Sequence, residues 1–158
     1  MRHSLEVGAS FGLTSGVITT LGLIVGLYAG TQSKLAVVGG VVTIAIADAL
    51  SDALGIHISE ESENKHTPKE IWVATLATFV TKFFISSTFL APILLMELQS
   101  AVIFSVIWGI ATLTALSYWL AVMQRVNPWM VIGEHLAVAA AVVIVAHYLG
   151  VFVARTFG

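Results

Sequence analysis

Residues 7–29 read VGASFGLTSGVITTLGLIVGLYA and contain no charged side chain. About 20 consecutive apolar residues suffice for a helix to cross the hydrocarbon core of a bilayer. Four more apolar runs of comparable length follow, at residues 35–58, 70–95, 100–123 and 129–154. We therefore predict an all-α integral membrane protein in which residues 1–158 form one domain, a bundle of five transmembrane helices.

The composition agrees with a lipid environment. Hydrophobic residues make up 58% of the chain and charged residues 10%, whereas about a quarter of an average soluble domain is charged. The formal net charge of −2 gives no reason to expect a nucleic-acid partner. Because the chain has no cysteine, disulfides and thiolate metal sites are excluded. The spans carry no cofactor motif and no HExxH sequence, so we expect neither an enzyme nor a bound cofactor.

The basic residues that flank the spans predict the orientation of the bundle. With five spans, one membrane face carries Arg2, Lys65, Lys69 and Arg125, and the other carries Lys34 and Arg155. Since cytoplasmic loops are richer in Lys and Arg, we expect a cytoplasmic N-terminus and a C-terminus on the outside. In a prokaryote, the membrane of this multi-pass protein would be the plasma membrane.

The first span is rich in glycine, mostly at intervals of four residues. The glycines are Gly8, Gly12, Gly16, Gly22, Gly26 and Gly30. Small residues on one face let another helix approach closely. The approaching helix belongs either to the same chain or to a second copy in a homodimer.

Two carboxylates lie inside the second span. Asp48 and Asp52 are four residues apart, so they share one face of the helix. A carboxylate at mid-helix costs at least ~2.5–3.5 kcal/mol. Two of them repel each other unless one is protonated or a cation lies between them. We therefore expect both side chains to face a cavity, a mobile cation or a charged partner.

Polar residues of three other spans fall at a similar depth. They are Thr14 and Ser15 in the first span, Lys82 in the third, and Glu134 and His135 in the fifth. A carboxylate and an imidazole can complete a metal site with the two aspartates, whereas the hydroxyls and the ammonium would line an ion path or a proton relay. Alternatively, Lys82 pairs with one aspartate in a buried ion pair that only fixes the register of the helices.

The inner end of the second span is acidic. His57 lies at this expected mouth, and Glu60, Glu61 and Glu63 follow it. The run is either a solvated extension of the helix or a region that concentrates cations by its local potential. His57 is either part of the ion path or merely interfacial. Carboxylate, imidazole and hydroxyl ligands suit divalent ions such as Fe²⁺, Mn²⁺ and Ca²⁺, and the same carboxylates can carry protons.

These motifs resemble the vacuolar iron transporter family. Residues 12–16 read GLTSG, similar to the family's Gly-Leu-Thr-Asp-Gly motif in its opening helix. Residues 47–55 read ADALSDALG and residues 59–63 read SEESE, similar to its second helix and the Ser/Glu-rich extension that follows. Pro92 and Gly150 also fall where the family tends to place such residues. The resemblance covers most of the chain and is strongest over the first two spans.

The resemblance implies a five-helix protomer with an inner N-terminus and an outer C-terminus. It also implies a homodimer whose cation path lies between the subunits, and export of divalent metal from the cytosol coupled to protons. The chain would be a divergent, short member, because the family's long metal-binding insertion is reduced to residues 59–69.

Several family positions carry other residues here. The family's first-helix aspartate falls on Ser15, its second-helix methionine on Asp52 and the nearby glycine on Asp48, while its glutamate two turns earlier falls on Ile44. The acidic groups have thus moved from the first helix to the second. Because a carboxylate replaces a soft thioether at Asp52, selectivity for softer metals would be weakened.

We accordingly predict a proton-coupled transporter of divalent cations of the iron or manganese kind. Asp48 and Asp52 would carry the ion or proton, supported by Glu134 and His135. One alternative is a transporter of another small charged solute that uses Asp48, Asp52 and Lys82. A second alternative is a membrane scaffold in which an Asp–Lys pair is structural.

Overall fold

The computed structural model describes residues 1–158, and all of its regular structure is helical. Five helices are long and apolar enough to span a membrane, which confirms the five predicted spans of a multi-pass membrane protein. They are α1 (Arg2–Thr31); α2 (Lys34–Thr43), a π-helical turn η1 (Ile44–Asp48) and α3 (Ala49–Ser62); α4 (Pro68–Thr88) with α5 (Leu90–Leu95); α6 (Leu98–Gln124); and α7 (Pro128–Phe157). The helices extend past the apolar runs, because polar flanking residues continue the backbone hydrogen bonding.

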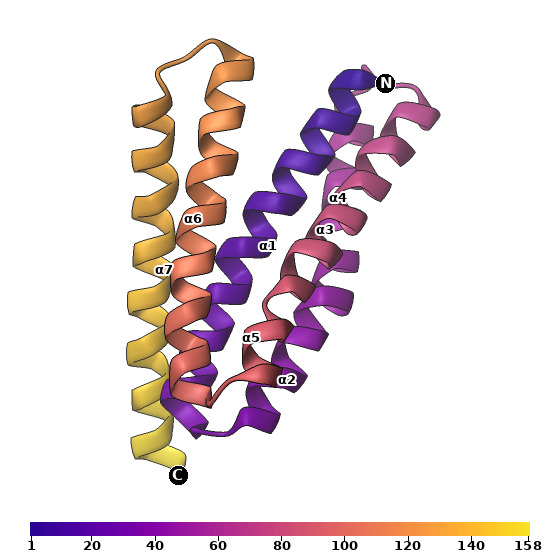
Figure 1. Cartoon of the computed structure of the whole chain (residues 1–158). Coiled ribbons are helices and arrows are strands. Elements are labelled where there is room, and N and C mark those ends of the chain that lie inside the picture. The colour runs from indigo at the N-terminus through magenta and orange to yellow at the C-terminus, as the bar shows by residue number, and fades with distance from the viewer.

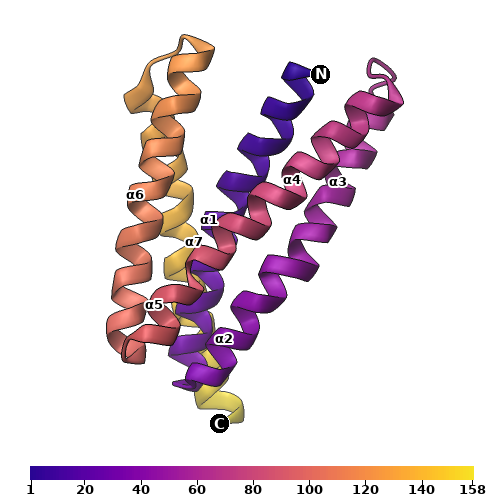
Figure 2. The same ribbon diagram turned by 45° about the vertical axis from the view of Figure 1, so that its right-hand side comes forward.

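Successive spans run antiparallel, and α1 lies between two helical hairpins. Helices α3 and α4 flank it on one side and α6 and α7 on the other (Figures 1 and 2). The N-terminus lies at the same end as the α3–α4 and α6–α7 connections, and the C-terminus lies at the opposite end (Figure 1). The side of the membrane on which each end lies stays a prediction from the basic residues.

Local capping explains where two of the spans begin. The hydroxyl of Thr67 accepts a hydrogen bond from the Glu70 N–H, and the Glu70 carboxylate accepts one from the Thr67 N–H, so that a capping box starts α4 just before Pro68. Asn127 Oδ1 accepts from the Trp129 N–H at 3.1 Å and starts α7, with Pro128 at its first position. Both caps lie at the end of the bundle that holds the N-terminus.

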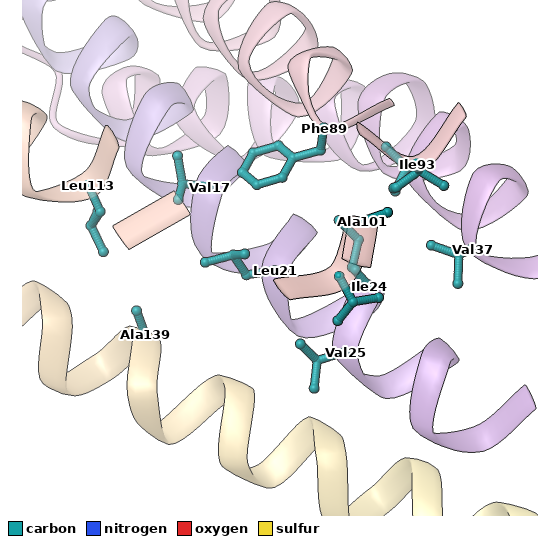
Figure 3. Packing of buried hydrophobic residues seen from close by; sticks show 12 residues of the cluster. Val17, Leu21, Ile24, Val25, Val37, Phe89, Ile93, Ala101, Leu113 and Ala139 are labelled. Carbon is teal, nitrogen blue, oxygen red and sulfur yellow. The ribbon is translucent and has the colours of Figure 1, made fainter. Parts of the chain in front are cut away.

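The apolar core is built around the second half of α1. Figure 3 shows Leu21 and Ile24 facing side chains of the other spans, among them Phe89 between α4 and α5 and Leu113 of α6. These four side chains are essentially inaccessible to solvent or lipid. The large apolar residues at the outer surface, by contrast, suit contact with lipid.

The glycines of α1 pack against helices of the same chain. A methyl group added at Gly8 would overlap the carbonyl oxygen of Ala74 in α4. In the second half of α1, a methyl added at Gly30 would lie 3.2 Å from the Gly150 carbonyl oxygen of α7. Close packing within the chain, one of the two interpretations from the sequence, therefore accounts for this glycine series on both sides of α1.

We predict that Gly8→Ala destabilises the protein. The new methyl has no room against the α4 backbone, so α1 and α4 must separate, at a cost of roughly 1–3 kcal/mol. Chemical or thermal unfolding in detergent micelles measures the change. Gly133→Ala in α7 (Pro128–Phe157) is the matched control, because a methyl there meets no atom within 4 Å; it should leave stability unchanged or raise it by up to about 1 kcal/mol. Equal stabilities of the two variants would contradict the close α1–α4 contact.

Candidate functional site

A buried lysine joins the first three spans. Lys82 of α4 has no exposed surface, and its Nζ lies 2.6 Å from Oδ2 of Asp48 and also contacts Oδ2 of Asp52. The side chains of Asp48 and Asp52 are 38% and 22% exposed. The two aspartates predicted to share a face are thus held by one cation, as the sequence analysis considered.

Ser15 of α1 completes this group. Its hydroxyl donates a hydrogen bond to Oδ2 of Asp52 at 2.6 Å and accepts one from Nζ of Lys82 at 3.0 Å. The glycines on either side of this part of α1 bring the helix close enough to α4 for this contact. We call Ser15, Asp48, Asp52 and Lys82 the Lys82 cluster.

The π-helical turn precedes the two aspartates. It ends at Asp48, and the Ala49 N–H reaches back to the carbonyl of Ile44, five residues earlier. One extra residue in the turn rotates α2 relative to α3 about the axis of the span. Such turns occur often at functional sites. Here the turn sets the direction in which Asp48 leaves the helix, toward α4.

The Lys82 cluster is not balanced in charge. Two carboxylates face one ammonium, so that the fully ionised group carries one net negative charge inside the bundle. Oδ2 of Asp48 is buried and, although it lies close to Nζ, it has no hydrogen-bond donor with acceptable angles. An ion pair that served only to fix helix register would need one carboxylate, and the second one therefore calls for an explanation.

The other predicted ligands lie elsewhere in the bundle. His135 of α7 contacts α6, where its Nδ1 lies 2.8 Å from the hydroxyl of Ser117. Because Ser117 gives its proton to the carbonyl of Leu113, Nδ1 of His135 must be the donor. Glu134 is exposed on the outer surface of α7 and forms no ion pair with the rest of the chain. The structure therefore does not bring Glu134 and His135 to the two aspartates.

Thr14 and His57, which were predicted to line the ion path, differ in their contacts. Thr14 is half-buried and makes no side-chain hydrogen bond to the Lys82 cluster. His57 faces α4, where its Nδ1 lies 2.9 Å from Oγ1 of Thr75 and its ring packs edge-on against Trp72. His57 therefore lies at the same α3–α4 interface as the aspartates.

The acidic run at the end of α3 divides into exposed and buried members. Glu61 and Glu63 are exposed, as a solvated helix extension would be, but the side chain of Glu60 is only 9% exposed. The sequence analysis did not single out His66, whose Nε2 lies 3.6 Å from Oε2 of Glu60. Asn64 is the sequence feature that could have predicted this contact. Asparagine readily adopts the left-handed conformation seen here (φ 53°), which reverses the chain and brings His66 back toward Glu60.

No group of three or more His, Asp or Glu side chains is arranged to hold a metal ion. At the two aspartates the position between the carboxylates is filled by the ammonium of Lys82.

No protein-family model matches the sequence, and no curated protein or solved structure matches it either. The resemblance to vacuolar iron transporters therefore stays a prediction from the motifs.

We predict that Lys82→Met destabilises the protein by up to about 3 kcal/mol, because it leaves two partly buried carboxylates without their cation. Unfolding in detergent micelles measures the loss. Lys69→Met, at an exposed lysine of the same helix, should change stability by less than about 0.5 kcal/mol. If Lys82→Met were as stable as the wild type, the ion pairs would not hold the three helices together.

Proposed function

We propose that the protein is a membrane transporter that exchanges a divalent metal cation for protons, with the Lys82 cluster as its ion site. The single observation that carries this proposal is the excess carboxylate: two aspartates share one ammonium within a membrane-spanning bundle. A net charge in lipid is costly, so the site favours states in which an added proton or cation neutralises it.

Charge arithmetic defines two neutral states. In the first, Asp48, Asp52 and Lys82 carry charges of −1, −1 and +1, and one added proton brings the sum to zero. In the second, a divalent ion lies between the carboxylates, and the sum is zero only if Lys82 gives up its proton. Loading one divalent ion therefore releases two protons, and the exchange is electrically neutral.

The donor set fits this role. Two carboxylates and the Ser15 hydroxyl are oxygen ligands, which hard and borderline divalent ions prefer. Asp48 carries the more exposed of the two carboxylates. An ion therefore enters the site past Asp48. Lys82 acts as a tethered cation that fills the site when no metal is present.

A homodimer belongs to the same proposal. The outer face of the second span carries small, exposed residues at intervals of four, an arrangement that permits close helix packing: Gly39, Thr43, Ala47, Ser51 and Gly55. A second copy packed on this face would cover Asp48 and shield the ion from lipid. The glycines of α1 pack against helices of the same chain, so the second span is the better candidate for the contact between two subunits.

Flux measurements in proteoliposomes test the proposal. Wild-type protein should move Mn²⁺ or Fe²⁺ against about two protons per ion, and an imposed membrane potential should leave the rate unchanged. Asp52→Asn and Lys82→Met should each reduce flux to the level of empty liposomes. Absence of metal-dependent flux in the wild type would contradict the proposal and favour transport of another charged solute.

The complete burial of Lys82 favours one second candidate, a non-transporting scaffold in which the cluster is structural. Asp48→Asn combined with Lys82→Met tests it, because the double variant keeps only one carboxylate and no ammonium. A scaffold should remain folded and functional, whereas a transporter should lose flux even where the fold survives.

A further inference from the structure

A buried carboxylate without a hydrogen-bond donor lies at the inner end of α3. The side chain of Glu60 is 9% exposed, and its Oε2 accepts no hydrogen bond. The group that faces it is the imidazole of His66, with Nε2 at 3.6 Å. A buried carboxylate is costly unless it is protonated or paired with a cation, and His66 is the neighbour that can supply the proton or the positive charge.

The other charged groups near this pair are more exposed. Glu63, which is half-exposed, lies 4.0 Å from Nε2 of His66 and pairs with Lys65 at 3.6 Å. The ring of His3, from the start of α1, stacks on the His66 ring with 6.4 Å between centroids. Solvated charges of this kind interact weakly, whereas the Glu60–His66 contact is shielded.

His57 lies between this pair and the Lys82 cluster on the same helix. Along the axis, Glu60 is about 4.5 Å from His57, and His57 about 7.5 Å from Asp52, at 1.5 Å per residue. Thr75 gives its hydroxyl proton to the carbonyl of Ile71 at 2.8 Å, so its oxygen accepts a hydrogen bond from Nδ1–H of His57. This assigns the proton of the neutral ring to Nδ1 and leaves Nε2 as the basic nitrogen.

We propose that Glu60 and His66 share one proton and form the proton entry site of the α3–α4 interface, with His57 as the next proton acceptor along α3. The proton leaves the imidazolium of His66 for the carboxylate of Glu60. The carboxylic acid then gives it to Nε2 of His57. Each step moves one proton between a donor and an acceptor that the chain itself supplies. The relay rests on the proposed function, whereas proton sharing by the pair does not.

Infrared difference spectroscopy of the purified protein tests the proton site without reference to transport. Glu60→Gln keeps the shape of the side chain but cannot bind the proton. Upon acidification, the wild type should gain a carboxylic-acid C=O band that Glu60→Gln lacks. Glu97→Gln, at an exposed carboxylate in the α5–α6 connection at the other end of the bundle, should keep the band, as should Asp52→Asn. Identical spectra from wild type and Glu60→Gln would overturn the proton site.

The relay is tested by the pH profile of flux in proteoliposomes. Glu60→Gln should shift the pH midpoint of metal–proton exchange by about one unit or more, while Glu97→Gln keeps the wild-type profile. If Glu60→Gln loses the infrared band but leaves the flux profile unchanged, the relay is overturned and the ion site stands. If the wild type shows no flux at all, the proposed function fails, and the infrared result still decides whether the pair holds a proton.

Discussion

The ammonium of Lys82, shared between two carboxylates, is the interaction on which the arrangement of the first three spans depends. An unpaired ammonium or carboxylate at this depth would be expensive in lipid, and neither can move to water without unpacking the bundle. Asp48 and Asp52 of the second span must therefore face the third span. Because the cation neutralises only one of them, the same contact that holds the helices together leaves a charge that a proton or a metal ion can balance.

Close packing of α1 makes this site possible. The glycines in its first half remove the side chains that would keep α1 away from α4, and those in its second half do the same toward α7. As a result, the short side chain of Ser15 reaches both Asp52 and Lys82. A single helix thus contacts the Lys82 cluster on one flank and the α6–α7 hairpin on the other.

Much of the fold could be predicted from the sequence, because an apolar run of about 20 residues has few alternatives to a transmembrane helix. Position along the bundle axis could also be predicted, since each helical residue advances it by about 1.5 Å. Asp48, Asp52, Lys82 and Ser15 were expected at one level, and the structure joins them. Glu134 and His135 were expected at that level too, but lateral neighbours depend on which helix faces which, and α1 separates α7 from α3.

Two other features were not predicted from the sequence. The π-helical turn before Asp48 lies in an ordinary apolar stretch, so its extra residue is visible only in the backbone hydrogen bonds. The contact of His66 with Glu60 depends on a reversal of the chain at Asn64. Both features act at the ends of the α3–α4 interface, where the direction of one side chain decides whether a carboxylate finds a partner.

The central claim is that a visiting cation competes with the Lys82 ammonium for the two aspartates. Isothermal titration of the purified protein with Mn²⁺, repeated in buffers with different heats of ionisation, measures this competition directly. The account predicts metal binding with release of protons to the buffer, and loss of both in Asp52→Asn. Equal heats from wild type and Asp52→Asn, or binding without proton release, would contradict it.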